Sequence, residues 1–433
     1  MVSTKEKLTG LFYEFKELEL ETGIERDITS KINEFLNKRH ILAITGVRRS
    51  GKTTIMYQLM DYLIKSKIPK ENIIYFNFDN KKLYPLNGDE LDIFLDTYME
   101  EFSISKKHQI YLFLDEIQNI PDWERWIKGI YDTKTNIKFI VSGSSATLLS
   151  SELSTLLTGR NLKFEVFPFS FLEYLRYKKF IYKSLNELKF SSKKIPLKKL
   201  FKEYVEYGGF PEVFDYKKKK YLLQNYYEDI ILKDVVKRFE IKSSKTIEDL
   251  ASVLMANISN LISYNKLKDT LDCSVNTVKD YMKYLETAYL FFEMNIFTYS
   301  MKKQIVNPRK VYCIDTGLRN VVSFKFSEDI GRIAENIVFV ELKRRDKEIF
   351  YWKNKNEVDF LVKEGLKPKQ LIQVCWDVSD KKTKQREIEG LLEAMKKLKL
   401  RKGLIITDDY EKEEKIDGKE IKYIPLWKWL LIK

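Results

Sequence analysis

The sequence predicts an α/β fold in which short buried strands alternate with amphipathic helices. Residues 40–45 form a short apolar run, which is typical of a buried parallel strand. Apolar residues then recur at helical spacing: Ile55, Met56, Leu59, Met60 and Leu63. A second apolar run, at residues 109–114, ends in two adjacent carboxylates. Together these observations indicate a parallel sheet whose strands are joined by helices.

The length and composition indicate a globular protein of several domains. At 433 residues the chain is too long for one typical core, so about two to four domains are expected. The hydrophobic content of 44% and the charged content of 32% are those of a folded protein rather than a disordered one. Three cysteines without a C-x-x-C pair and only two histidines argue against a disulfide framework, a zinc ribbon and a Ser-His-Asp triad. With no signal peptide and no apolar run of membrane-spanning length, we expect a cytoplasmic protein without a membrane partner.

Much of the formal net charge of +14 lies in the middle of the chain. Residues 176–221 contain 14 basic and five acidic side chains, which gives this stretch a net charge of +9. A basic surface of this kind suits an anionic partner, most often nucleic acid such as double-stranded DNA. A lysine-rich solvated surface explains the same composition, and the sequence leaves both interpretations open.

The loop between the first strand and the following helix has the pattern of a phosphate-binding loop. Residues 46–53 read GVRRSGKT, which fits G-x-x-x-x-G-K-[ST]. Glycines let backbone N–H groups surround phosphate oxygens at a helix N-terminus, where the helix dipole favours negative charge. We expect Lys52 to reach the β- and γ-phosphates of ATP and the Thr53 hydroxyl to hold Mg²⁺. The expected nucleotide contacts are Gly46, Arg49, Ser50, Gly51, Lys52, Thr53 and Thr54.

The second apolar run ends in Asp115 and Glu116. An Asp that a strand delivers to a phosphate loop supplies an outer-sphere ligand of Mg²⁺ in ATPases of this kind. A Glu directly after it is placed to polarise the attacking water as a general base. Two adjacent acids after an apolar run are less well explained as a charged strand end in solvent. We therefore expect Asp115 to be a metal ligand, and Glu116 and Lys52 to be catalytic.

Two further polar positions are candidates for contact with the γ-phosphate. Residues 137–145 read as a further strand, which ends in hydroxyls. Of these, Ser142 or Ser144 could lie between the Asp-Glu strand and the phosphate loop. The alternative, that these serines cap the next helix, is equally good. Arg160 follows a glycine turn and could neutralise transition-state charge in its own chain or in a neighbouring one. It could equally pair with an acid on the surface.

Taken together, these motifs resemble those of the additional-strand P-loop ATPases, of which the AAA+ proteins are one branch. More narrowly, the chain resembles archaeal and bacterial ATPases that pair an AAA-type domain with a domain of unknown function. The segments that support this narrower resemblance are GVRRSGKTT (46–54), LDEI (114–117), SGSS (142–145), TGR (158–160), PFSF (168–171), YGGFPE (207–212) and YCIDTGL (312–318). The resemblance covers about residues 36–375. It implies a P-loop NTPase parallel sheet of the additional-strand type, with ATP binding and hydrolysis, but no settled biological role.

By pattern and resemblance, the chain is expected to contain four regions. They are an AAA-type ATPase domain with an N-terminal helical lead-in (1–170), a helical lid or linker (171–240), a winged helix-turn-helix (241–320) and a degenerate nuclease-like domain (321–433). Within the third region, Ser274 caps a candidate recognition helix. Its expected inward side chains are Val275, Val278, Tyr281, Met282 and Leu285, and its outward ones are Asn276, Thr277, Lys279 and Lys283. Winged helices also serve as protein contacts, so DNA contact and protein contact both stay open.

The last region resembles the α/β core of restriction endonucleases. By that match Glu335 and Asp359 would be ligands of a divalent ion. In that core the third strand carries an acid and, two residues later, a lysine. Here the third expected strand, at residues 371–375, departs from the pattern, because Gln373 stands where the acid belongs and Cys375 where the lysine belongs. Loss of both groups weakens metal binding and nucleophile activation, which predicts a domain that does not cleave nucleic acid.

The sequence therefore predicts a Mg²⁺-dependent ATPase that is coupled to DNA binding through a basic winged-helix half. The alternative is a nucleotide-dependent protein-interaction switch without DNA binding. An ATP-regulated nuclease is a third, weaker hypothesis. The sequence does not indicate the oligomeric state.

Overall fold

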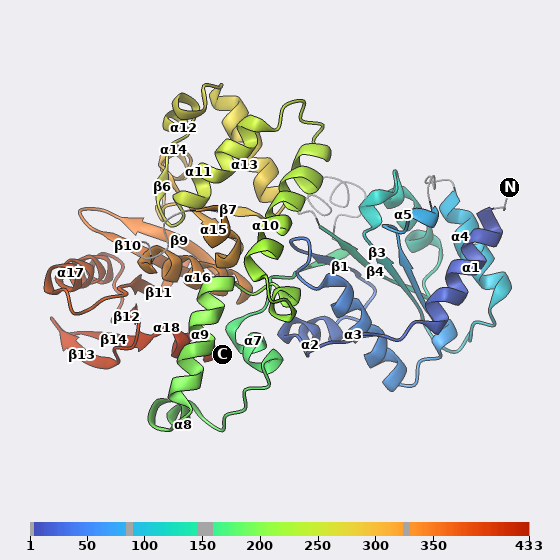
Figure 1. The fold of residues 1–433 in the computed structure, drawn as a ribbon, viewed down its shortest axis with the longest axis horizontal. Coiled ribbons are helices and arrows are strands. Elements are labelled where there is room, and N and C mark those ends of the chain that lie inside the picture. Colours follow the sequence, from blue (N-terminus) through green and yellow to red (C-terminus); the bar gives the residue numbers. More distant parts are fainter. Residues whose placement is uncertain (1–3, 84–89, 145–158, 324–329, 433) are drawn as a thin grey trace. The chain divides into compact units, whose positions relative to one another are not determined.

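The computed structural model describes residues 4–83, 90–144, 159–323 and 330–432. The chain divides into two compact units, Met1–Val166 and Phe167–Lys433, and each is described by itself. In Figure 1 the first unit is coloured blue to cyan-green and the second green to red. Among the described residues, no helix is both long enough and apolar enough to cross a membrane.

The first unit is built on a five-stranded parallel sheet with the strand order β2-β3-β4-β1-β5 (Figure 1). Its strands are β1 (Ile41–Thr45), β2 (Ile73–Asn77), β3 (Ile110–Asp115), β4 (Ile137–Gly143) and β5 (Asn161–Glu165). The predicted α/β fold with a parallel sheet is confirmed for this unit. Strand β4 is inserted between β1 and β3, and the register pairs Thr45 of β1 with Gly143 of β4. The carboxyl ends of β1, β3 and β4 therefore lie at one edge of the sheet.

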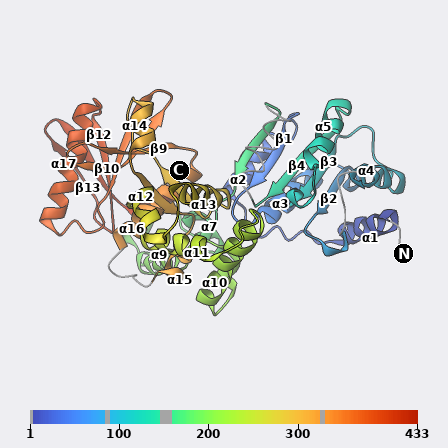
Figure 2. The same cartoon turned by 90° about the horizontal axis from the view of Figure 1, so that it is seen from above.

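Helices cover both faces of this sheet (Figures 1 and 2). They are α1 (Thr4–Glu17), α2 (Asp27–Asn33), α3 (Lys52–Lys65), α4 (Glu90–Glu101) and α5 (Trp123–Thr133). Ile41 and Ala43 of β1 join the buried core beneath α1, α4 and α5. Leu42 and Ile44 point the other way and join the core beneath α2 and α3. Because successive strand residues face opposite sides, a strand that is buried on both faces reads as a continuous apolar run.

The second unit begins with helices and continues into a small sheet. The helices are α7 (Phe171–Tyr177), α8 (Leu185–Phe190), α9 (Lys194–Tyr207) and α10 (Lys219–Asp229), and the last continues as a π-helical segment, Ile230–Lys237. A three-stranded antiparallel sheet follows in the order β6-β8-β7, with β6 (Leu261–Ile262), β7 (Phe291–Met294) and β8 (Arg309–Cys313). Its helices are α11 (Lys245–Ala256), α12 (Tyr264–Leu271), α13 (Val275–Thr287), α14 (Met301–Val306) and α15 (Thr316–Val322).

The carboxyl-terminal part of the second unit is a six-stranded mixed sheet with the order β13-β14-β12-β11-β10-β9. Its strands are β9 (Glu348–Lys353), β10 (Glu357–Glu364), β11 (Lys367–Val374), β12 (Lys402–Thr407), β13 (Lys412–Ile416) and β14 (Lys419–Pro425). Its helices are α16 (Ile330–Arg344), α17 (Lys381–Lys397) and α18 (Leu426–Leu431). Leu391 and Met395 of α17 pack on Leu361 and Leu371 of the sheet in one buried cluster. This part is separate from the parallel sheet of the first unit.

A glycine-rich junction joins α9 to α15 in the second unit. The Asp315 carboxylate accepts hydrogen bonds from the backbone N–H of Gly209 at 2.7 Å and of Gly317 at 2.8 Å. Burial raises the pKa of Asp315 to about 6. A Cβ atom at Gly317 would lie 2.2 Å from the carbonyl oxygen of Tyr207, so no larger residue fits without movement of the backbone.

The substitution Gly317→Ala tests this close approach. We expect it to destabilise the protein by about 1–3 kcal/mol, because the added methyl meets backbone rather than a flexible side chain. Thermal and denaturant unfolding followed by circular dichroism would measure the change. The matched control is Gly331→Ala in helix α16, where an added Cβ meets nothing within 4 Å. Equal stability of the two variants would contradict the packing argument.

Candidate functional site

The phosphate loop joins β1 to α3 and needs glycine at two positions. Gly46 has φ +150°, and a Cβ there would lie 2.2 Å from the carbonyl oxygen of Val166. Gly51 has φ +94° and directly precedes helix α3. The loop is therefore pressed against the end of β5 on one side and opens onto a helix N-terminus on the other.

The Lys52 side chain runs back along the loop that precedes it. Its ammonium group lies 3.3 Å from the carbonyl oxygen of Gly46 and 3.4 Å from that of Val47. It also lies 3.5 Å from a carboxylate oxygen of Glu116. Only 4% of the side chain is exposed. Because the ammonium group contacts these two carbonyl oxygens, its positive charge is directed into the loop.

The Asp115 carboxylate, at the end of β3, is the centre of the site. Its Oδ2 accepts hydrogen bonds from the Thr53 hydroxyl at 2.7 Å and from the Tyr75 hydroxyl at 3.0 Å. Its Oδ1 accepts a hydrogen bond from the Ser142 hydroxyl. Burial, followed by the nearby charge of Glu116, raises the pKa of Asp115, while the Ser142 and Thr53 hydroxyl groups oppose the shift. The carboxylate thus joins the phosphate-loop helix to strands β2 and β4.

Glu116 follows in a left-handed conformation, with φ +52°. Its backbone N–H donates a hydrogen bond to the Ser142 hydroxyl oxygen at 3.0 Å. Its Oε2 accepts a hydrogen bond from the Gln118 amide at 2.5 Å, and the side chain is 19% exposed. A non-glycine residue held at positive φ stores backbone strain. Here the turn separates the Glu116 side chain from the buried Asp115 and leaves it partly open to solvent.

The structure brings together five of the residues singled out from the sequence. These are Lys52, Thr53, Asp115, Glu116 and Ser142. Of the other loop positions, Ser50 is buried, Arg49 is exposed and Thr54 is half-buried. Ser144 is also buried, at 1% exposure. Ser145 and Thr158 lie outside the described residues.

Arg160 does not reach this site in its own chain. Its carbonyl oxygen accepts a hydrogen bond from the Ile41 N–H at 2.8 Å, which places it where β1 and β5 begin. That edge of the sheet is opposite the carboxyl ends that hold the phosphate loop. Its guanidinium forms an ion pair with Asp132 and lies 5.5 Å from the centre of the Tyr131 ring. Within its own chain, Arg160 thus has the surface pairing that was one of its expected alternatives.

Two residues of the site carry no motif in the sequence. Arg26 is 4% exposed and donates a hydrogen bond from Nη1 to the Ser50 carbonyl oxygen at 2.9 Å, so it stabilises the conformation of the phosphate loop. Tyr75 lies in the middle of β2 and reaches across to Asp115. A tyrosine within an apolar strand next to the Asp-Glu strand is a weak signal that could have indicated the contact between Tyr75 and Asp115. The contact of Arg26 depends on tertiary packing alone.

Family models divide the chain into three matched segments. A model for an AAA domain matches residues 38–175, and two models for domains of unknown function, DUF8612 and DUF4143, match residues 198–329 and 330–429. An uncharacterized protein of Methanocaldococcus jannaschii is 38% identical over 94% of this chain and 91% of its own length. An uncharacterized protein of Haemophilus influenzae is 30% identical over 91% of this chain and 95% of its own length.

The chain belongs to the family of these relatives. Its members occur in archaea and in bacteria, and the AAA domain of this chain implies nucleotide binding and suggests hydrolysis. Among solved structures, the Aeropyrum pernix Orc1 protein in complex with DNA is 11% identical, with a TM-score of 0.34, covering 75% of this chain and 98% of that one. Cdc6p from Pyrobaculum aerophilum is 12% identical, with a TM-score of 0.27, covering 72% of this chain and 92% of that one. Both TM-scores are low, so the family assignment rests on the sequence relatives.

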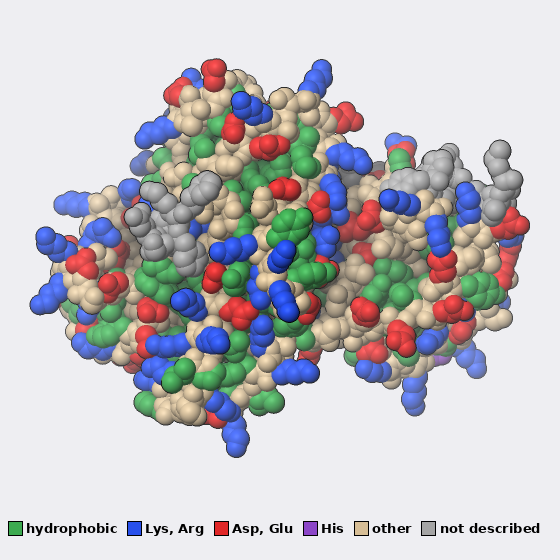
Figure 3. Space-filling model, in the orientation of Figure 1, with side chains coloured by type: hydrophobic (Ala, Val, Ile, Leu, Met, Phe, Trp, Pro, Cys, Tyr) green, Lys and Arg blue, Asp and Glu red, His purple; other side chains and the backbone are tan. Residues whose placement is uncertain are grey.

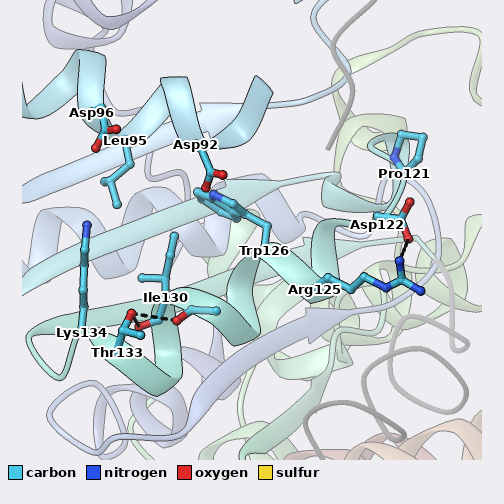
Figure 4. A pocket seen from close by; sticks show the side chains of 11 residues that line it. Asp92, Leu95, Asp96, Pro121, Asp122, Arg125, Trp126, Ile130, Thr133 and Lys134 are labelled. Atoms are coloured by element: carbon cyan, nitrogen blue, oxygen red, sulfur yellow. Dashed lines mark hydrogen bonds and ion pairs between the residues drawn. The ribbon is translucent and has the colours of Figure 1, made fainter. Parts of the chain in front are cut away.

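A large cavity of the AAA domain lies away from the phosphate loop. It measures about 790 Å³ and lies between α4 and α5, where Asp92, Trp126, Ile130 and Arg125 line it (Figure 4). The described residues that line it include none of the expected nucleotide contacts. Cavity size therefore does not locate the site, and the chemistry of the AAA domain is assigned from the phosphate loop and its carboxylates.

The contact between Arg26 and the phosphate loop can be tested with nucleotide. We expect Arg26→Ala to weaken ATP binding about tenfold, because the Ser50 carbonyl loses a charge-assisted hydrogen bond that fixes the loop. Isothermal titration calorimetry would measure the affinity. Arg39→Ala is the control, since Arg39 contacts the Tyr131 carbonyl and ring rather than the loop. Unchanged affinity in a folded Arg26→Ala protein would exclude the supporting role.

Proposed function

We propose that the AAA domain binds ATP with Mg²⁺ and hydrolyses it. The observation that best supports this is the constellation around Asp115, in which Thr53, Ser142 and the backbone of Glu116 meet at the carboxyl edge of the sheet. Thr53 Oγ1 and Asp115 Oδ2 are hard oxygen donors 2.7 Å apart, which is the donor set that Mg²⁺ prefers. The residues present therefore fit this ion, which would neutralise phosphate charge during the reaction.

Each residue of the constellation has a separate task in this proposal. The backbone of the loop and the Lys52 ammonium bind the phosphate groups, and Thr53 and Asp115 hold the ion. Glu116 takes a proton from the attacking water as a general base, and the Gln118 amide orients its carboxylate. Ser142 hydrogen-bonds both Asp115 and the backbone of Glu116, so it keeps the two acids in place. The Lys52 ammonium and the Glu116 carboxylate lie 3.5 Å apart, so the cation that binds phosphate and the base that takes the proton of water are neighbours in this proposal.

Two substitutions separate binding from turnover. Lys52→Ala should abolish detectable ATP binding, because the buried cation that faces the loop is lost. Glu116→Gln should keep ATP binding but lower kcat by about a hundredfold or more, because the amide cannot accept the proton of water. Phosphate release and calorimetry would measure the two effects. Normal turnover in either variant would refute the assignment of the site.

We further propose that the second unit comprises a helical lid or linker (171–240), a winged helix (241–320) and a nuclease-like domain (321–433). The order α11-β6-α12-α13-β7-α14-β8, with a sheet in the order β6-β8-β7, supports the winged helix. In helix α13 the apolar residues Val278 and Met282 are buried. This helix begins at the Ser274 cap, as expected, and exposes polar side chains along its other face.

For this unit we propose, more specifically, that α13 contacts DNA. Asn276, Lys279 and Lys283 are exposed on one helix, a composition suited to a major groove. The basic stretch at residues 176–221 supports DNA contact less well, because many of its lysines form ion pairs with acids of the same unit. These lysines are Lys178, Lys189, Lys193, Lys194, Lys198 and Lys219. Figure 3 likewise shows basic side chains interspersed with acidic ones on this face.

A protein-interaction switch is the second candidate, and one observation favours it. Helix α14 and the residue before its cap expose a row of apolar side chains. These are Tyr299, Met301, Ile305 and Val306, each at least two-thirds exposed. Apolar side chains gathered on one short exposed segment are typical of a protein contact. The two candidates therefore use different surfaces of the second unit.

A salt titration distinguishes these candidates. If α13 contacts DNA, binding to duplex DNA should weaken steeply as salt rises, through release of counterions. Lys279→Ala combined with Lys283→Ala should weaken binding and flatten that salt dependence. The control pair, Lys381→Ala with Lys382→Ala, removes the same charge from the exposed start of α17. Fluorescence anisotropy would measure binding, and no binding even at low salt would favour the protein-interaction switch.

A further inference from the structure

A buried lysine occupies the centre of a carboxylate cluster in the second unit. Lys310 of β8 lies 3.0 Å from Glu335 of α16, and 2.9 Å from both Glu357 and Asp359 of β10. Only 3% of its side chain is exposed. An ammonium group is stable at such burial only when acceptors surround it, and here three carboxylates do so.

The carboxylates are also fixed by neutral partners. Glu335 Oε1 accepts a second hydrogen bond, from the Tyr312 hydroxyl at 2.7 Å. Asp359 uses Oδ1 for Lys310 and accepts a hydrogen bond at Oδ2 from the Val374 N–H at 3.0 Å. The two acids expected to be metal ligands are therefore brought together, but their oxygens are directed at an amine and at protein donors.

The third strand of this core, β11, supplies neither an acid nor a cation to the cluster. The Gln373 amide accepts a hydrogen bond from the Asp359 N–H at 3.1 Å and donates one to Glu387 at 2.6 Å. Cys375 is 2% exposed, and its backbone N–H pairs with the Ile406 carbonyl. Among the described residues, no group of three or more His, Cys, Asp or Glu side chains is placed to hold a metal ion. A divalent cation does not fit this cluster as it stands.

We infer that Lys310 takes the place of a divalent cation in this cluster, so that its carboxylates join β8 to α16 and β10 instead of serving a metal-dependent nuclease reaction. A metal ion would have to share these carboxylate oxygens with an ammonium group that lies about 3 Å from them, and the positive charges of the ion and the ammonium group would repel each other. Further contacts support the joining role. The Asn336 amide bonds both the N–H and the carbonyl of Cys313, at 2.9 and 3.0 Å.

The Lys310 cluster lies in a different part of the chain from the proposed ATP site and does not depend on it. The cluster borders an open cleft of about 670 Å³, so an ion in solution has access to it. A failure to bind metal would therefore reflect the cluster itself. Lys310 lies on β8 and is at least 25 residues away in sequence from each carboxylate that it contacts, so these contacts join separate elements of the fold.

Binding of Mn²⁺ to the full-length protein tests the inference directly. Without nucleotide, the wild type and Asp359→Asn should bind the same amount of Mn²⁺ by electron paramagnetic resonance, because Asp359 is already satisfied by Lys310. Supercoiled plasmid DNA should stay intact with both proteins in Mn²⁺ or Mg²⁺. A Mn²⁺ site or DNA nicking that is present in the wild type and lost in Asp359→Asn would overturn the inference. Glu335→Gln provides the same comparison if Asp359→Asn does not fold.

The joining role is tested by thermal unfolding. Lys310→Met should lower the Tm of the second unit by about 5–10 °C, because it leaves buried carboxylates without a cation. The control is Lys353→Met, which removes an exposed lysine that also pairs with Glu357, at 3.2 Å, and should shift the Tm by less than about 2 °C. Adding Asp359→Asn to Lys310→Met should recover part of the loss, or recover folding if the single variant is unfolded. Equal Tm values for the two lysine variants, or no recovery in the double variant, would contradict the inference.

Discussion

The hydrogen bonds of the buried Asp115 carboxylate determine the geometry of the whole first site. One oxygen accepts from the phosphate-loop helix through Thr53, and the other accepts from β4 through Ser142. These contacts are possible only because β4 lies between β1 and β3 and the strands are parallel, so that their carboxyl ends meet at one edge. The fold thus brings together short polar side chains from segments far apart in the sequence and holds them by an acceptor that burial keeps away from water.

Much of this site follows from local patterns in the sequence. The phosphate loop, the strand before it and the helix after it are read from about twenty consecutive residues, and the fold confirms the parallel sheet that they predict. Asp115 and Glu116 are recognisable because they end an apolar run. Ser142 could be singled out as a strand-end hydroxyl, but the choice between a γ-phosphate contact and a helix cap needed the order of the strands. In the structure it bonds both Asp115 and the backbone of Glu116.

The residues that sequence reasoning missed act through long-range contacts. Arg26 supports the phosphate loop from 24 residues upstream, and nothing in its neighbours marks it. Arg160 shows the converse, because its position after a glycine turn suggested a catalytic arginine. The parallel pairing of β5 with β1 places it at the opposite edge of the sheet from the phosphate loop. A strand's direction within a sheet is a tertiary property, so a motif at a strand start cannot show which edge it will reach.

Two of the buried lysines among the described residues, Lys52 and Lys310, show why one residue type serves two purposes. Lys52 has a single carboxylate, Glu116, at 3.5 Å, together with two backbone carbonyls, and its partners are weak enough to exchange for phosphate oxygens. Lys310 is surrounded by three carboxylates at 2.9–3.0 Å, so any exchange would leave several buried charges uncompensated.

From the sequence, the departure of Gln373 and Cys375 from the nuclease pattern was visible. The lysine that compensates for it belongs to a strand outside that pattern, which is why the missing cation could be noticed and its replacement could not. The number and distance of carboxylates, rather than the presence of a lysine, therefore decide whether such a site is open to a ligand or closed by the protein itself.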